Sequence, residues 1–180
     1  MRSSIDIFNA LHHQLMLVPD IVSEFENKSW TAVPHWLDWI KTSENLLKTF
    51  QFAECSKIAG IHAEILAVSH QEGTRMKQKK LLVSKCLESI SPAQLIVSNL
   101  YEVAHNKIET AESLLRQIIT TMKNSGLFEG QDVLDQSFAI NLLNQILQNS
   151  QLSPSINNII ASLGYSDVLR LLKTELSNII

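Results

Sequence analysis

Apolar side chains recur along the chain at intervals of three and four residues, and few segments alternate residue by residue. Spacing of three and four places side chains on one face of an α-helix, whereas alternation is typical of a β-strand. The pattern therefore predicts helix almost throughout. Because the predicted connections are short, we expect successive helices to pack antiparallel around one apolar core. The predicted fold is all-α, an up-and-down-like antiparallel bundle of about six to eight helices.

Proline and a shift of phase set the predicted helix ends in the first part of the chain. Pro19 interrupts the apolar stripe that runs from Phe8 to Phe25 without changing its register, which predicts one kinked helix. Another stripe follows Pro34. Its phase slips near residues 49–52, so we expect the helix to break there.

Ser91, Pro92 and Gln94 form the clearest local signal in the sequence. They combine an N-cap residue, a proline at the first helical position and a capping-box amide. We therefore predict that a short helix ends near residue 90 and that a long helix begins at Ser91. Gly126 is expected to end that helix.

The last part of the chain predicts shorter helices. Ser153 followed by Pro154 is a start signal, Gly164 is a stop signal, and Ser166 is expected to cap the final helix. We leave open whether residues 131–180 form a C-terminal subdomain.

The composition is typical of a globular chain. Of the 180 residues, 45% are hydrophobic and 18% are charged, which is far from the composition of a disordered chain. A chain of this length can bury its own core without disulfides or metals. We therefore expect residues 1–180 to form a single helical domain.

The sequence contains no apolar run long enough for a membrane helix, and its first residues lack the apolar stretch of a signal peptide. Cys55 and Cys86 fall at apolar helical positions and have no metal-ligand spacing. We interpret both as reduced core residues. The expectation is a cytoplasmic protein without membrane insertion.

Residues 136–166 contain no Asp, Glu, Lys or Arg, although they are rich in Asn and Gln. Helices that face water normally carry charge, and the centre of a protein interface is depleted in charge. We therefore predict a surface for a protein partner or for a second copy of the chain, as in a homodimer. Two alternatives stay open, that these helices lie inside the bundle or that the amides only solvate them. The predicted interface residues are Asn141, Asn144, Gln145, Gln148, Asn157 and Asn158.

The middle of the chain is basic, although the net charge of the whole chain is -3. The net charge and the lack of interleaved aromatic residues argue against a nucleic-acid partner. Binding of an anion or an acidic partner is a weaker hypothesis, and an ordinary solvated helix face is its alternative. The basic cluster consists of Arg75, Lys77, Lys79, Lys80 and Lys85.

His62, Glu102 and His105 form a candidate metal site. Glu102 and His105 have the three-residue spacing of bundle metal sites, and His62 is predicted at a similar height along the bundle. A di-iron bundle needs two such motifs, and a zinc site needs further ligands. We expect no cofactor, with a divalent metal as the weaker alternative. In the competing interpretation His62 is a hydrogen-bonded core residue and Glu102 is a surface carboxylate.

Trp30, Trp36 and Trp39 with His35 concentrate aromatic side chains, which could pack in the core or line a groove for an apolar ligand. Phosphate-loop, nucleophile-elbow and zinc-protease motifs are absent from the sequence. The sequence therefore favours a non-enzymatic helical interaction or scaffold module. The alternative is a bundle that binds a metal or small ligand near His62, with enzymatic activity left open.

Overall fold

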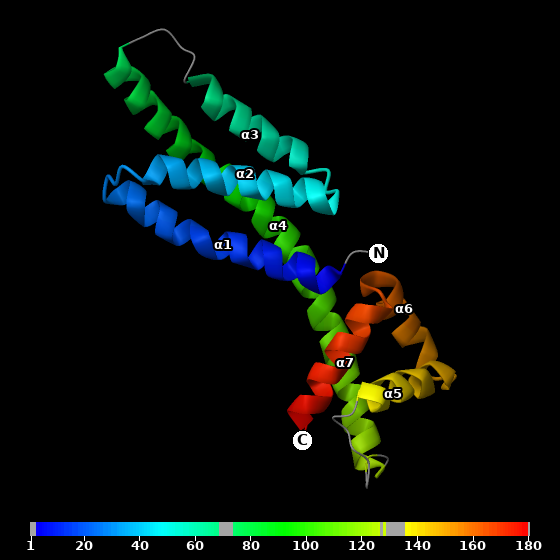
Figure 1. The fold of residues 1–180 in the computed structure, drawn as a ribbon. Helices are drawn as coiled ribbons and strands as arrows, with labels where there is room; N and C mark the ends of the chain where they lie inside the picture. The colour runs from blue at the N-terminus through cyan, green and yellow to red at the C-terminus, as the bar shows by residue number, and fades with distance from the viewer. Residues whose placement is uncertain (1–2, 69–73, 127, 129–135, 180) are drawn as a thin grey trace. The chain divides into compact units, whose positions relative to one another are not determined.

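The computed structural model describes residues 3–68, 74–126, 128 and 136–179, and these residues form seven α-helices and no strand (Figure 1). The predicted all-α fold is therefore confirmed. None of the helices in these ranges combines the length and apolar character that a membrane-spanning segment needs. The helices are α1 (Ser4–Glu26), α2 (Ala32–Phe50), α3 (Cys55–Val68), α4 (Arg75–Asn124), α5 (Gln136–Gln148), α6 (Ser153–Leu163) and α7 (Tyr165–Ile179).

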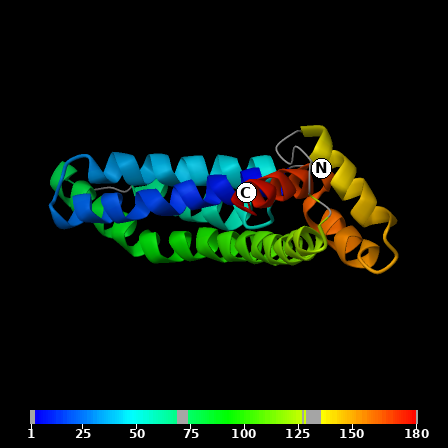
Figure 2. The same cartoon turned by 90° about the horizontal axis from the view of Figure 1, so that it is seen from below.

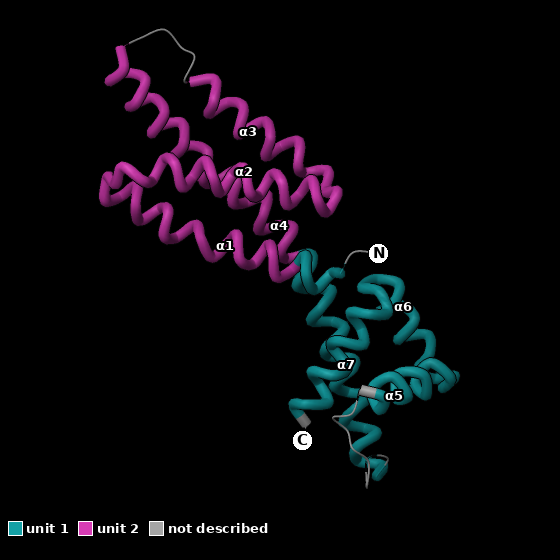
Figure 3. The backbone as a smooth tube through the Cα atoms, in the orientation of Figure 1, with its two compact units in different colours: residues 1–7, 103–180 teal, residues 8–102 magenta. Residues whose placement is uncertain are grey.

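The chain divides into two compact units (Figure 3). Unit 1 contains residues 1–7 and 103–180, and unit 2 contains residues 8–102. The unit boundary falls inside α4, so this helix contributes its first half to unit 2 and its second half to unit 1. The number of domains stays a prediction.

One long helix, α4, replaces the two helices predicted on either side of Ser91. The predicted helix start is wrong, because Pro92 lies inside the continuous helix. The buried positions keep their spacing of three and four across the proline, so continuity of the helix keeps one face in the core. These positions are Cys86, Ser89, Ala93 and Val97. Pro92 itself is exposed, on the side of a helix where bending is tolerated.

The other predicted helix ends are largely confirmed. Helix α1 continues through Pro19. Helix α2 ends where Gln51 adopts a left-handed conformation with φ 62°, and Gly164 ends α6 with φ 96°, backbone angles that stop a helix. Ser166 does not cap the last helix, because α7 begins at Tyr165 and only Gly164 separates it from α6.

The core of unit 2 is organised around two tryptophans of α2. The rings of Trp36 and Trp39 are stacked, with centroids 4.7 Å apart and planes 10° apart. Trp36 Nε1 donates to Ser89 Oγ of α4 at 2.8 Å, and Trp39 Nε1 donates to the Gln14 carbonyl of α1 at 2.7 Å. Both buried indole N–H groups therefore have acceptors, and they connect α2 to α4 and to α1.

In unit 1, α5, α6 and α7 pack against one another in all three pairings. Glu175 of α7 is buried, with 3% of its surface exposed. Its two oxygens accept Nε and Nη2 of Arg116 of α4 at 2.8 and 2.9 Å. This hydrogen-bonded pair raises the pKa of Arg116 above its usual value. The paired geometry compensates the buried carboxylate and connects α4 to the three shorter helices.

The buried carboxylate of Asp167, at the start of α7, accepts hydrogen bonds from the first residues of α1 and from the residue before it. Asp167 accepts Ser3 Oγ at 2.8 Å and the backbone N–H groups of Ser4 and Ile5. A carboxylate stabilises the first turn of a helix, where N–H groups lack helical partners. Arg170 donates to Asp6 nearby at 2.9 Å, and this hydrogen bond lowers the pKa of Asp6.

The two cysteines differ in accessibility, which gives a testable prediction. Cys86 is fully buried at 0% exposure, and burial raises the pKa of its thiol to about 11. Cys55 is half-buried and donates to the Glu44 carbonyl. Because the thiolate is the reactive form, we expect a thiol reagent at about pH 8 to label Cys55 in the native protein and Cys86 only in denaturant. Mass spectrometry after timed labelling distinguishes the two sites, and equal native rates would contradict the prediction.

Candidate interaction surface

The six predicted interface amides all lie on the outside of unit 1. They are Asn141, Asn144, Gln145 and Gln148 of α5 with Asn157 and Asn158 of α6, which we call the amide surface. Each of these side chains is exposed, while the same helices bury apolar side chains that include Leu143, Ile146 and Ile156. The six amide side chains are therefore accessible at the surface of unit 1, and the alternative that these helices lie centrally in the bundle stays open. Solvation of the helices by the amides stays open.

Asn149 and Asn157 form hydrogen bonds in the turn between α5 and α6 and at the start of α6. Asn149 Oδ1 accepts the backbone N–H groups of Gln151 and Leu152 at 2.9 and 3.3 Å, which shapes the turn between α5 and α6. Asn157 Nδ2 donates to Ser153 Oγ at 3.0 Å. The other five side chains of the amide surface make no hydrogen bond to the described part of the chain. Their donors and acceptors are therefore open to water or to a partner.

Helices α4 and α7 carry most of the charge of unit 1 among the described residues, and α5 and α6 carry none.

An apolar cavity of about 200 Å³ lies beside the turn between α5 and α6. It is lined by Leu152 of the turn and by four residues of α4, Gln117, Ile118, Thr121 and Met122. A cavity of this size accommodates one large apolar side chain, the usual anchor of a protein interface.

The candidate metal residues each have a different environment. His62 is half-buried, with Nδ1 3.0 Å from Glu44 Oε2. His105 Nε2 lies 3.8 Å from Glu109 Oε2, and Glu102 is exposed. Within the described ranges no three His, Cys, Asp or Glu side chains form a group that could hold a metal. His62 and Glu102 belong to unit 2 and His105 to unit 1, and the site made of these three residues stays a prediction.

Of the basic cluster, Lys85 forms an ion pair. Lys85 Nζ lies 2.9 Å from Glu64 Oε2 of α3, and this hydrogen-bonded carboxylate raises the pKa of Lys85. The remaining members form no ion pair with any residue that the structure describes. These are Arg75, Lys77, Lys79 and Lys80, and all four are exposed.

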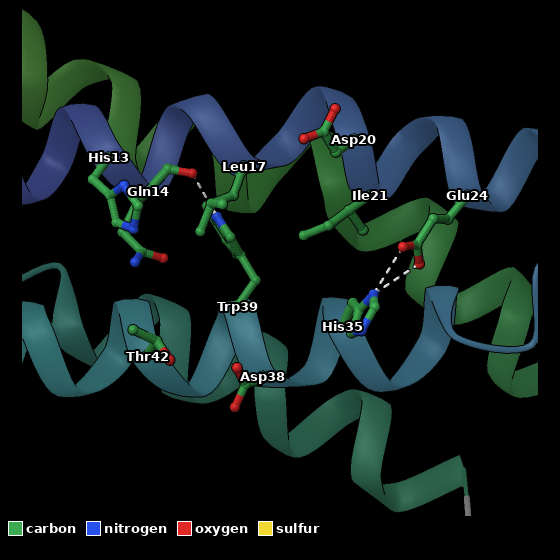
Figure 4. A pocket seen from close by; sticks show the side chains of 10 residues that line it. All are labelled: His13, Gln14, Leu17, Asp20, Ile21, Glu24, His35, Asp38, Trp39 and Thr42. Atoms are coloured by element: carbon green, nitrogen blue, oxygen red, sulfur yellow. Dashed lines mark hydrogen bonds and ion pairs between the residues drawn. The ribbon is translucent and has the colours of Figure 1, made fainter.

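A cavity of about 410 Å³ lies between α1 and α2 in unit 2 (Figure 4). His35 Nδ1 lies 2.9 Å from both Glu24 oxygens at one end, and Leu17 and Ile21 contribute apolar wall. Trp39 also lines it. The sequence analysis named His35 and Trp39 and offered a groove there as one alternative, but it did not identify the α1 residues, because the relative placement of two helices is a tertiary property.

No protein-family model, no curated protein and no solved structure matches the chain.

Proposed function

We propose that this chain is a non-enzymatic helical interaction module that associates with a second copy of itself through the amide surface. One observation carries the proposal. Six exposed amides lie on two helices of a segment that has no charged side chain. Charged side chains make a surface that only faces water more soluble. At an interface they weaken binding, because each charge must be removed from water when the partners associate.

A second copy is the occupant that the chemistry of this surface favours. A two-fold interface brings a patch against its own image, so the patch must complement itself. Each Asn and Gln side chain carries both donors and an acceptor, and can therefore pair with an identical side chain. Lysine or glutamate opposite its own image would repel it. A neutral amide also costs less to desolvate than a charged group.

The dimensions of the two helices set the expected strength of the contact. Helix α5 has 13 residues and α6 has 11, which corresponds to lengths of about 20 and 16 Å. With helix diameters of about 10 Å, the footprint is roughly 400 Å². A standard interface buries about 800 Å² on each partner, so we expect a weak, concentration-dependent dimer.

Sedimentation velocity over a range of concentrations tests this self-association. We expect the weight-average sedimentation coefficient of the native chain to rise between about 10 µM and about 1 mM, the range in which a dimer with a dissociation constant of about 100 µM forms. Asn144→Lys combined with Asn158→Lys places like charges in both copies and is expected to abolish the rise. Asn106→Lys is the matched control, because Asn106 is exposed on α4 of the same unit.

A native chain that stays monomeric over the whole range would contradict the proposal. So would a dimer that the two amide-surface substitutions leave unchanged while Asn106→Lys dissociates it. Circular dichroism of each variant verifies that the helices are retained.

A further inference from the structure

One end of unit 2 exposes two large apolar side chains. Trp30 in the connection between α1 and α2 is 83% exposed, and Met76 in the first turn of α4 is 73% exposed. The other two tryptophans, Trp36 and Trp39, are buried. The α1–α2 connection and the start of α4 both lie at the left in Figure 2 and lie apart in Figure 1, and Trp30 of the connection and Lys79 of α4 line one cavity.

Residues of both segments line a cavity of about 360 Å³. Its apolar wall comes from Phe25 and Val33 on one side and from Leu82 and Val83 of α4 on the other. Trp30 lines the same cavity, and so do two cations. These cations are Lys28 and Lys79. The cavity therefore places an exposed tryptophan among apolar and basic side chains.

Helical spacing adds further basic residues to this end. Arg75 and Met76 precede Lys79 by four and three residues, and Lys80 follows Met76 by four, so they share neighbouring positions on the helix surface. The cations are exposed and form no ion pair within the described part of the chain. Residues 73–85 contain no Asp or Glu. We call Lys28, Trp30, Arg75, Met76, Lys79 and Lys80 the basic aromatic end.

We propose that the basic aromatic end docks on the surface of an anionic phospholipid bilayer. Tryptophan favours the boundary between headgroups and acyl chains. Clustered lysine and arginine side chains are attracted to anionic headgroups. Cations that form no ion pair with the described residues thus favour an anionic occupant. The exposed side chains of Met76 and of Trp30, which lines the cavity, favour an apolar phase. An acidic protein surface would use only the cations, and nucleic acid would find a single exposed aromatic ring for stacking.

Vesicle binding tests this docking with Trp30 as the internal reporter. Because the other two tryptophans are buried, a change in emission on binding reports chiefly on Trp30. We expect vesicles of phosphatidylcholine with about 30% phosphatidylserine to shift the emission to shorter wavelength and to co-sediment the full chain. Phosphatidylcholine vesicles alone are expected to do neither, and added salt is expected to weaken the binding.

Substitutions separate the charged and the apolar contributions. Arg75→Gln combined with Lys79→Gln is expected to weaken binding to the anionic vesicles roughly thirtyfold. Trp30→Ala is expected to abolish the emission shift and to weaken co-sedimentation. Lys57→Gln is the matched control, since Lys57 is exposed on α3 of the same unit and outside this end. We expect it to change binding by less than about twofold.

Three results would overturn the docking proposal. The first is equal binding to neutral and anionic vesicles. The second is a loss of binding in Lys57→Gln as large as in the double variant. The third is the absence of vesicle binding while a poly-glutamate peptide or an oligonucleotide binds, which would assign the cations to an acidic protein or to nucleic acid. The amide surface lies in unit 1, so the sedimentation result does not decide this proposal.

Discussion

Trp36→Ala is expected to lower the free energy of unfolding by about 3–5 kcal/mol, the usual cost of truncating a buried aromatic side chain. Trp36 is 0% exposed, stacks on Trp39 and donates to Ser89. The alanine leaves a cavity between α2 and α4 and removes the ring contact. Since domains are stable by only about 5–15 kcal/mol, this is a large part of the total.

Urea denaturation followed by circular dichroism measures the effect of Trp36→Ala without relying on tryptophan emission. Trp30→Ala is the matched control, because the same side chain is removed from a position that is 83% exposed. We expect this control to change the unfolding free energy by less than about 0.5 kcal/mol. Similar losses in the two variants would contradict the assignment of Trp36 to the core and Trp30 to the surface.

Leu143→Ala is the second substitution with a large expected effect, about 2–5 kcal/mol of lost stability. Leu143 of α5 is 0% exposed, within the helices α5, α6 and α7 that pack together. Truncation therefore opens a cavity in unit 1. We expect an earlier urea transition in the circular-dichroism signal.

The neighbouring residue provides the control for Leu143→Ala. Asn144 lies one position further along α5 and is exposed. Asn144→Ala is expected to be neutral within about 0.5 kcal/mol or slightly stabilising, because alanine is the better helix former. If Asn144→Ala destabilises the chain as much as Leu143→Ala, the amide surface is part of the core and the proposed contact is wrong.

The spacing of apolar residues predicted the helical fold because each helix must bury one face, and this requirement is written locally in the sequence. The same spacing continues through Ser91 and Pro92, where the chain forms one helix instead of starting a new one. The cap and proline chemistry there favours a helix start, but the buried positions keep their register through Pro92. A local start signal carries less free energy than a continuous buried face.

Residues that are distant in the sequence account for what could not be predicted. His62 hydrogen-bonds to Glu44, and the pairing depends on how α2 and α3 pack rather than on any motif. Trp30 lies in the connection before α2, whereas Trp36 and Trp39 lie within α2. The exposure of Trp30 and the burial of the other two still depend on the tertiary arrangement. The exposure of the amides, by contrast, follows from their position opposite the apolar stripes of α5 and α6.

Paramagnetic relaxation between two copies of the chain tests the proposed self-association most directly. One sample carries a spin label on Asn158→Cys, with Cys55→Ser as a second substitution and with Cys86 protected by burial. It is mixed with chain that carries no spin label and is enriched in ¹⁵N. We predict that the label broadens the amide signals of α5 and α6 in the second copy. Broadening confined to other helices, or none at concentrations up to about 1 mM, would contradict the claim that these helices form the contact.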